Sequence, residues 1–68
     1  MKAPFDIIDY ETGEILTLIG EKVNERTVEI LKDFCAPRVG RANELDDHER
    51  DYLDDALFVL SLGEGQPQ

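Results

Sequence analysis

The stretch LDDHERDYLDDALFVLSLG (residues 45–63) decides the fold that we predict for this chain. At roughly 100° per residue, its large apolar side chains fall on one arc of a helix and its acidic side chains fall on the opposite arc. The apolar set consists of Leu45, Tyr52, Leu53, Ala56, Leu57, Val59 and Leu60. The acidic set, with the preceding glutamate included, consists of Glu44, Asp47, Asp51, Asp54 and Asp55. The stretch therefore predicts a helix with one face in the core and one face of carboxylates.

The ends of this helix carry their own signals. Asp46 is expected to be the N-cap, because an aspartate side chain can accept a hydrogen bond from a free amide of the first turn. Glu49, three residues later, fits the second position of a capping box. Gly63 stands where a left-handed C-cap is expected. These signals place the helix at about residues 46–62.

Residues 4–20, PFDIIDYETGEILTLIG, contain two apolar, β-branched runs on either side of Glu-Thr-Gly. Gly13 can take the positive φ that closes a turn of three or four residues, so we predict an antiparallel hairpin over about residues 5–19. Two registers of the hairpin are possible. One core face is formed if Ile7 pairs with Leu16 and Phe5 with Leu18, and a slip of one residue would exchange the two faces.

Under that pairing, three isoleucines remain on the other face of the hairpin. A two-stranded sheet that is covered on one side only does not usually carry apolar residues on both faces. We therefore expect the tail, a loop or another subunit to cover the second face. The candidate surface for a homodimer consists of Ile8, Ile15 and Ile19.

The middle of the chain predicts a second amphipathic helix at about residues 24–36. Asn24 is the expected N-cap, and Pro37 ends the helix because it disfavours α geometry at the residue before it. Cys35 lies among apolar residues and is expected to be a buried, unreactive thiol. In the loop that follows, Arg38 and Arg41 are expected to pair with nearby carboxylates. The whole chain, residues 1–68, is thus predicted to be one α+β domain of ββαα order, with a flexible tail at 64–68.

Length and charge limit the functions that this domain can have. The chain has 68 residues, 16 acidic and 7 basic, and a formal charge of −9. Free nucleic acids and anionic membranes would be repelled, so a basic partner is the natural complement. A short chain gains burial by pairing with a second copy, which also favours a homodimer. With a single cysteine and neither a secretory signal nor an apolar span, a cytoplasmic location is expected.

Catalytic and metal-binding signatures are not found in the sequence. There is no glycine-rich phosphate loop and no nucleophile with a base close in sequence, so neither an enzyme nor a cofactor is expected. His48 could meet Asp51 or Tyr52 at helical spacing, but the chain offers too few nitrogen and sulfur ligands for a structural zinc site. The aspartate doublets lack the spacing of a calcium loop. No metal site is predicted.

The carboxylates at 44–55 are the strongest functional signal. Seven of the sixteen acidic residues fall in this window, with only Arg50 against them. Like charges four residues apart on a helix repel one another, so the strip costs some stability. It is either a solubilising face or a binding face. Phe58 falls on the same arc, and there it is either an anchor among steering charges or a core residue under the hairpin. The predicted partner-binding residues are Glu44, Asp47, Asp51, Asp54, Asp55 and Phe58.

In size, acidity and lack of catalytic motifs, the chain resembles the small proteins with which bacteriophages and other mobile elements block host machinery, such as anti-CRISPR proteins. The resemblance implies stoichiometric inhibition in the host cytoplasm, with an acidic face occupying the nucleic-acid-binding groove of a basic host protein or nucleoprotein complex. Two other hypotheses stay open. One is a homodimeric structural or assembly domain, and the other is an antitoxin-like regulator of a basic partner protein.

Overall fold

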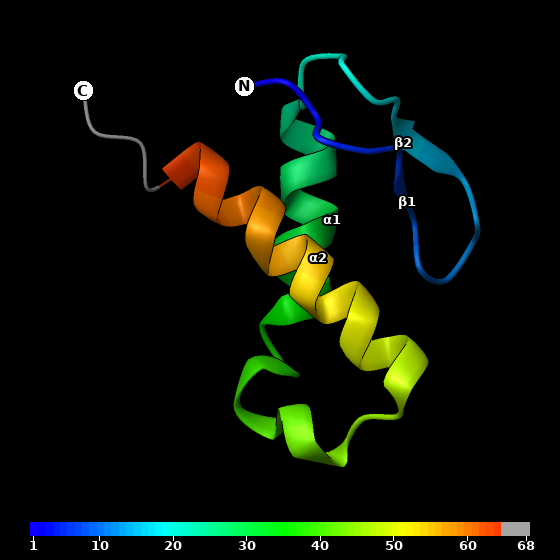
Figure 1. Cartoon of the computed structure of the whole chain (residues 1–68), viewed down its shortest axis with the longest axis vertical. Coiled ribbons are helices and arrows are strands. Elements are labelled where there is room, and N and C mark those ends of the chain that lie inside the picture. The colour runs from blue at the N-terminus through cyan, green and yellow to red at the C-terminus, as the bar shows by residue number, and fades with distance from the viewer. Residues whose placement is uncertain (65–68) are drawn as a thin grey trace.

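The computed structural model describes residues 1–64. Their elements follow one another as β1 (Ile7–Ile8), β2 (Ile15–Thr17), α1 (Glu25–Cys35), the short 3₁₀ helix η1 (Val39–Glu44) and α2 (Asp47–Glu64) (Figure 1). The predicted α+β fold of ββαα order is confirmed. Part of the predicted loop between the two helices forms η1. Of the tail predicted at 64–68, the first residue belongs to α2 and the other four lie outside the described residues.

The hairpin turn forms as the sequence predicts. The Asp9 amide donates to the Glu14 carbonyl oxygen at 2.8 Å, and the Gly13 amide donates to the Asp9 carbonyl oxygen at 2.9 Å. Gly13 has a φ of 77°, which a residue with a side chain rarely adopts. The Asp9 carboxylate also accepts from the Glu11 amide at 2.8 Å. A four-residue loop is thereby closed by both backbone and side-chain hydrogen bonds.

The register differs from the predicted one. Ile8 pairs with Ile15, but Ile7 pairs with Thr17, because the register shifts at a bulge between the two pairs. The pairing of Ile7 with Leu16 is therefore wrong, and the ladder does not extend to the expected second pair, Phe5 and Leu18. The bulge places Thr17 in the core, where its hydroxyl lies 2.9 Å from that of Thr27 on α1. A β-bulge inserts one extra residue into a strand, and here that residue lies in β2 between Ile15 and Thr17.

The hairpin continues further than predicted, because the N-terminal segment pairs with residues 20–23. The Ala3 amide donates to the Glu21 carbonyl oxygen at 2.8 Å, and the Val23 amide donates to the Met1 carbonyl oxygen at 3.0 Å. Between this part and β1, the Asp6 carboxylate accepts from the Ile19 amide at 2.8 Å. An irregular antiparallel ribbon thus runs from the first residue to the start of α1.

Both helices begin at the predicted caps. The Asn24 side chain accepts from the Thr27 amide at 2.8 Å, and the Asp46 side chain accepts from the Glu49 amide at 2.8 Å. The predicted C-cap is wrong. Gly63 does not have a positive φ and lies inside α2, which ends at Glu64 rather than at residue 62. Gly63 borders a depression that Met1, at the other end of the described chain, also lines, so the last turn of α2 packs near the N-terminal segment.

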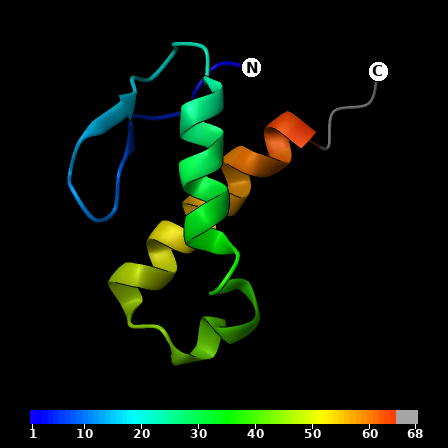
Figure 2. The ribbon, with the colours of Figure 1, turned by 180° about the vertical axis from the view of Figure 1, so that it is seen from behind.

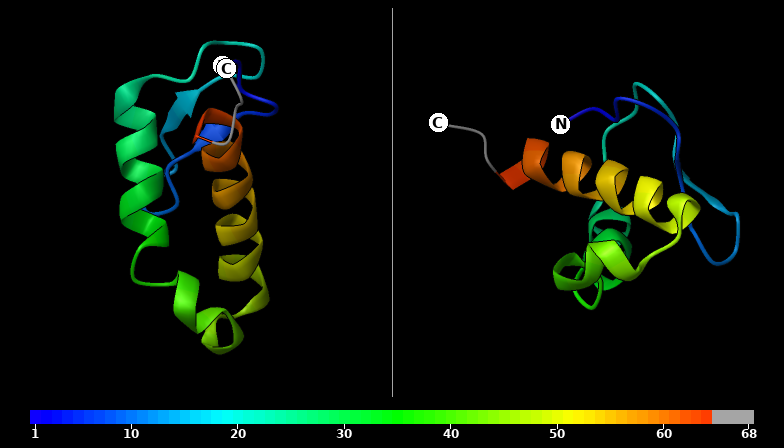
Figure 3. Two further views of the ribbon diagram at one scale, coloured as in Figure 1. Left: turned by 90° about the vertical axis from the view of Figure 1, so that its left-hand side faces the viewer. Right: turned by 60° about the horizontal axis from the view of Figure 1, so that its bottom comes forward.

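The core lies where the ribbon and the two helices meet. The chain runs along α1 and returns along α2, which crosses it obliquely, as the front and rear views show (Figures 1 and 2). The left view of Figure 3 shows the strands beside the two helices, toward the end of the helix pair away from η1. Leu57 was expected in the core, but its side chain is 36% exposed. On a helical projection Leu57 lies at the edge of the buried stripe, whose centre is near Ala56. The buried apolar residues are Ala3, Ile7, Val23, Leu31, Phe34, Cys35, Leu45, Leu53, Ala56 and Val59.

Candidate functional site

Four aspartates form one exposed strip along α2. We call Asp47, Asp51, Asp54 and Asp55 the acidic face, and all four are exposed. Among residues 1–64, none of the four makes an ion pair or a side-chain hydrogen bond. Arg50, the basic residue beside Asp51, makes no ion pair with them among the described residues, and Arg38 and Arg41 pair with other carboxylates. The strip therefore presents its carboxylates to solvent without an ion pair in the described part of the chain.

Glu44, the fifth predicted acid, lies in a different element. It is the last residue of η1, and its carboxylate lies 3.4 Å from Nε of Arg41. Both side chains of this pair are more than half exposed. Helical projection placed Glu44 beside the strip because it assumed that the helix continues upstream of Asp46, whereas Leu45 has extended geometry. The structure thus separates Glu44 from the acidic face.

Phe58 is not buried under the hairpin. Its side chain is 49% exposed. Its ring stacks on that of Phe5, with the centroids 6.5 Å apart and the ring planes 24° from parallel. Asp54 and Asp55 lie one turn before it on the same helix. Phe58 is therefore not a buried core residue, and its role as an anchor stays a prediction.

A groove of about 200 Å³ lies between the start of the hairpin and α2. Its walls are mainly apolar, and the carboxylates that line it belong to Asp6 and Asp55. We call this the β1–α2 groove. Its apolar lining from the hairpin and from α2 consists of Phe5, Ile7, Ile8, Ala56 and Val59.

The β1–α2 groove joins two sets of residues that the sequence kept apart. Ile8 was expected on a dimer surface and Asp55 on the partner-binding face, yet both line this groove. Ile15 and Ile19 do not line it, and they are 55% and 63% exposed on the hairpin. Sequence analysis missed Phe5 and Asp6 as candidates. Strand alternation places Phe5 in the core of the hairpin rather than at a binding site, and both residues precede the two-residue strand β1.

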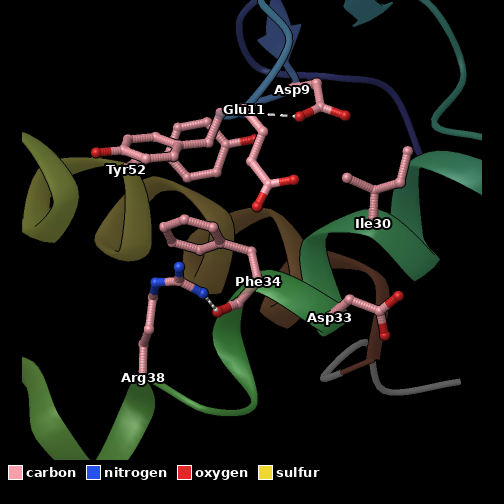
Figure 4. Close-up of a pocket in the computed structure, with 8 residues that line it drawn as sticks. Asp9, Glu11, Ile30, Asp33, Phe34, Arg38 and Tyr52 are labelled. Atoms are coloured by element: carbon pink, nitrogen blue, oxygen red, sulfur yellow. Dashed lines mark hydrogen bonds between the residues drawn. The ribbon is translucent and has the colours of Figure 1, made fainter.

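A second hollow, of about 220 Å³, lies over an aromatic cluster at the other end of the hairpin (Figure 4). The Phe34 ring contacts Tyr10 and Tyr52, with centroids 5.1 and 4.7 Å away. The guanidinium of Arg38 lies 4.0 Å from the Phe34 ring centre. Its Nη1 donates to the Phe34 carbonyl oxygen at 2.9 Å, and its Nε lies 2.7 Å from the Glu49 carboxylate. These contacts hold the start of α2 against the end of α1, so we assign this cluster a structural role.

Tyr52 and Cys35 are the groups in this region whose ionisation the fold disfavours. The Tyr52 hydroxyl donates to the carbonyl oxygen of Ile8, and burial, assisted by the negative charge of Asp9, raises the pKa of this phenol. Burial likewise raises the pKa of the Cys35 thiol, although the charge of Arg38 opposes the shift. A thiol with a raised pKa carries little thiolate at neutral pH and is a poor nucleophile. The predicted burial of Cys35 is confirmed.

His48 is exposed, and its ring lies 5.9 Å from that of Tyr10. In the part of the chain that the structure describes, no group of three or more histidine, cysteine, aspartate or glutamate side chains is placed to hold a metal ion. The same residues include no helix with the length and hydrophobicity needed to cross a membrane. In comparisons with known proteins, no family model, curated protein or solved structure matches this chain.

Proposed function

We propose that this protein is a non-enzymatic inhibitor or modulator that binds a basic surface of a partner through the acidic face of α2. The observation that supports the proposal is the strip of four exposed aspartates, which make no ion pair within residues 1–64, next to a half-exposed phenylalanine. A strip of this kind does not stabilise the isolated fold, since like charges at helical spacing repel. A partner rich in lysine and arginine would supply the missing counterions.

The row of charges suits competition with nucleic acid. Asp47, Asp51 and Asp55 recur every four residues, and at about 1.5 Å per residue they are spaced roughly 6 Å apart along the helix axis. A groove that neutralises phosphates with lysine and arginine would also attract such a row. We therefore propose, in keeping with the resemblance to anti-CRISPR proteins, that the target is a nucleic-acid-binding protein or complex in the cytoplasm of a host cell. The protein would act by occupying its groove.

Capture of the partner tests this proposal. Wild-type protein and the variant Asp51→Lys/Asp54→Lys/Asp55→Lys are immobilised and exposed to bacterial lysate at low and at high salt, and the bound proteins are identified by mass spectrometry. We expect a basic, nucleic-acid-binding protein to be enriched on the wild type at low salt only. The same protein retained equally by the charge-reversed variant would contradict the proposal.

Three exposed isoleucines of the hairpin support a second candidate function, that of a homodimeric structural or assembly domain. Ile8, Ile15 and Ile19 are 41%, 55% and 63% exposed, and no other described element covers the last two. Exposed apolar patches of this kind commonly mark interaction sites. In this candidate function the aspartates would serve solubility only.

A further inference from the structure

We infer that the β1–α2 groove receives one apolar side chain from a basic segment of the partner, so that binding to the acidic face is anchored there. The inference rests on the proposed function and adds the chemistry of the segment that is recognised. The ligand would be a lysine- or arginine-rich stretch that carries a single leucine-like or phenylalanine-like residue. Such a stretch satisfies both the charges and the apolar walls of this region.

The shape of the groove favours a single side chain. Its floor includes Ile7, Ala56 and Val59, each at most 3% exposed, while Ile8 at its mouth is 41% exposed. Its volume of about 200 Å³ is below the roughly 300–1,000 Å³ typical of pockets for drug-sized ligands. An apolar side chain placed there would leave water and contact a largely hydrophobic wall.

The charges around the groove favour a basic segment over a second copy of this chain. Asp6 and Asp55 line it, and no lysine or arginine of the described residues does. Asp51 and Asp54 lie on the adjoining turn of α2, and the whole chain carries a formal charge of −9. A second copy would bring another nine negative charges to an acidic rim, whereas a basic segment neutralises it.

The neighbouring aromatic pair joins the groove to the rest of the acidic face. Phe5 lines the groove and stacks on Phe58, which is half exposed on α2. A partner side chain in the groove would therefore lie beside an exposed aromatic ring, with carboxylates around both. Binding energy in protein interfaces concentrates in such apolar centres, and the surrounding charges add specificity and association rate.

The backbone at the groove favours insertion of a side chain over addition of a strand. A peptide that extended the sheet beside β1 would need the carbonyl oxygen of Ile8, because strand addition depends on main-chain hydrogen bonds along the edge. This oxygen already accepts from the Tyr52 hydroxyl, so an added strand would have to share it and make room for the Tyr52 side chain. The segment is therefore recognised through its side chains, and a helix or a loop could present them.

Two synthetic lysine-rich peptides of equal charge test the inference, one with a leucine at its centre and one with an alanine there. Fluorescence anisotropy at low salt measures their affinities for the wild type, for Ile8→Ser and for the matched control Ile15→Ser, an exposed isoleucine that does not line the groove. We expect the leucine peptide to bind the wild type and Ile15→Ser about tenfold more tightly than the alanine peptide, the size expected for burying a leucine. Ile8→Ser should lose most of this preference.

Methyl NMR spectra of the wild type add a site-resolved readout that does not depend on the variants. The leucine peptide should shift the methyl signals of Ile8, Ala56 and Val59 more than the alanine peptide does. Equal binding of both peptides with no preferential shifts would overturn the groove inference and leave the acidic-face proposal standing. If neither peptide binds at low salt, both the groove inference and the acidic-face proposal are overturned.

Discussion

Thr17 on β2 and Thr27 on α1 form a buried contact between the hairpin and that helix. Their hydroxyls lie 2.9 Å apart, and the two residues are 4% and 1% exposed. Either oxygen can be the donor, and Thr27 also lies 3.5 Å from the carbonyl oxygen of Leu16. A buried pair of hydroxyls in hydrogen-bonding contact avoids the desolvation cost that each would incur alone.

Replacing one of these threonines by valine should therefore cost more stability than replacing both. Thr27→Val keeps the shape of the side chain but leaves the Thr17 hydroxyl without its partner, which should reduce the free energy of unfolding by about 1–3 kcal/mol. Thr17→Val/Thr27→Val should recover part of this loss. Urea denaturation of the wild type, Thr17→Val, Thr27→Val and the double variant measures the coupling. Purely additive effects of the two single changes would contradict the assigned contact.

The two arginines that follow α1 should contribute very differently to stability. Arg38 is about one-quarter exposed and contacts the Glu49 carboxylate, the Phe34 carbonyl oxygen and the Phe34 ring. Arg38→Ala should lower the free energy of unfolding by about 2 kcal/mol, within the range for hydrogen bonds to charged groups. Arg41→Ala is the matched control, because its pair with Glu44 is exposed. If thermal melts showed the same loss of stability for both variants, Arg38 would have no special structural role.

Alkaline pH should destabilise the fold. Burial raises the pKa of both Tyr52 and Cys35, so above the pKa values of the unfolded state the native protein retains protons that the unfolded chain has lost. The free energy of unfolding then falls as pH rises, from about pH 9 upward, until the native groups ionise as well. Urea denaturation at pH 8 and at pH 10 measures the fall, which should be smaller for Tyr52→Phe. Stability that rises over this interval would contradict the assignment.

At the scale of elements, much of the fold could be predicted from the sequence. Helical periodicity and the cap residues Asn24 and Asp46 give both helices, and Gly13 gives the hairpin turn. Two features could not be predicted because they depend on tertiary contacts. The bulge that turns Thr17 inward accompanies its contact with α1, and the continuation of α2 through Gly63 accompanies packing near Met1.

The candidate site could be predicted only in part. The acidic arc of α2 follows from helical geometry, and the structure shows its four aspartates exposed on one face. The β1–α2 groove could not be found in the same way. It is formed by Phe5, Asp6 and Ile8 from one end of the chain and by Asp55 from the other. No local pattern in the sequence indicates that these residues are neighbours.

The outer face of α2 should tolerate large changes without loss of folding. Asp51→Lys/Asp54→Lys/Asp55→Lys removes like-charge repulsion at exposed positions, so the melting temperature should stay the same or rise slightly. Phe58→Ala should also cost little, since the side chain is half exposed. A buried phenylalanine would instead cost on the order of 3–5 kcal/mol. A large fall in the melting temperature of either variant would show that this face is part of the core.

At the scale of the whole molecule, the two candidate functions respond to salt in opposite ways. Association through the exposed face of the hairpin brings together two chains of charge −9, so screening should strengthen a homodimer. Sedimentation velocity at tens of micromolar should then show a dimer that salt favours and that Ile15→Ser/Ile19→Ser abolishes. A monomer at every salt concentration would contradict the assembly function.

The central claim is that the acidic face of α2 binds a basic partner. The most direct test is a binding titration of the captured partner against the wild type, Asp51→Lys/Asp54→Lys/Asp55→Lys and Phe58→Ala over a series of salt concentrations. We predict that the affinity of the wild type falls steeply with salt, that charge reversal abolishes binding, and that Phe58→Ala weakens it with little change in salt dependence. Binding by the charge-reversed variant as tight as that of the wild type would contradict the claim and leave the strip as a solvated surface.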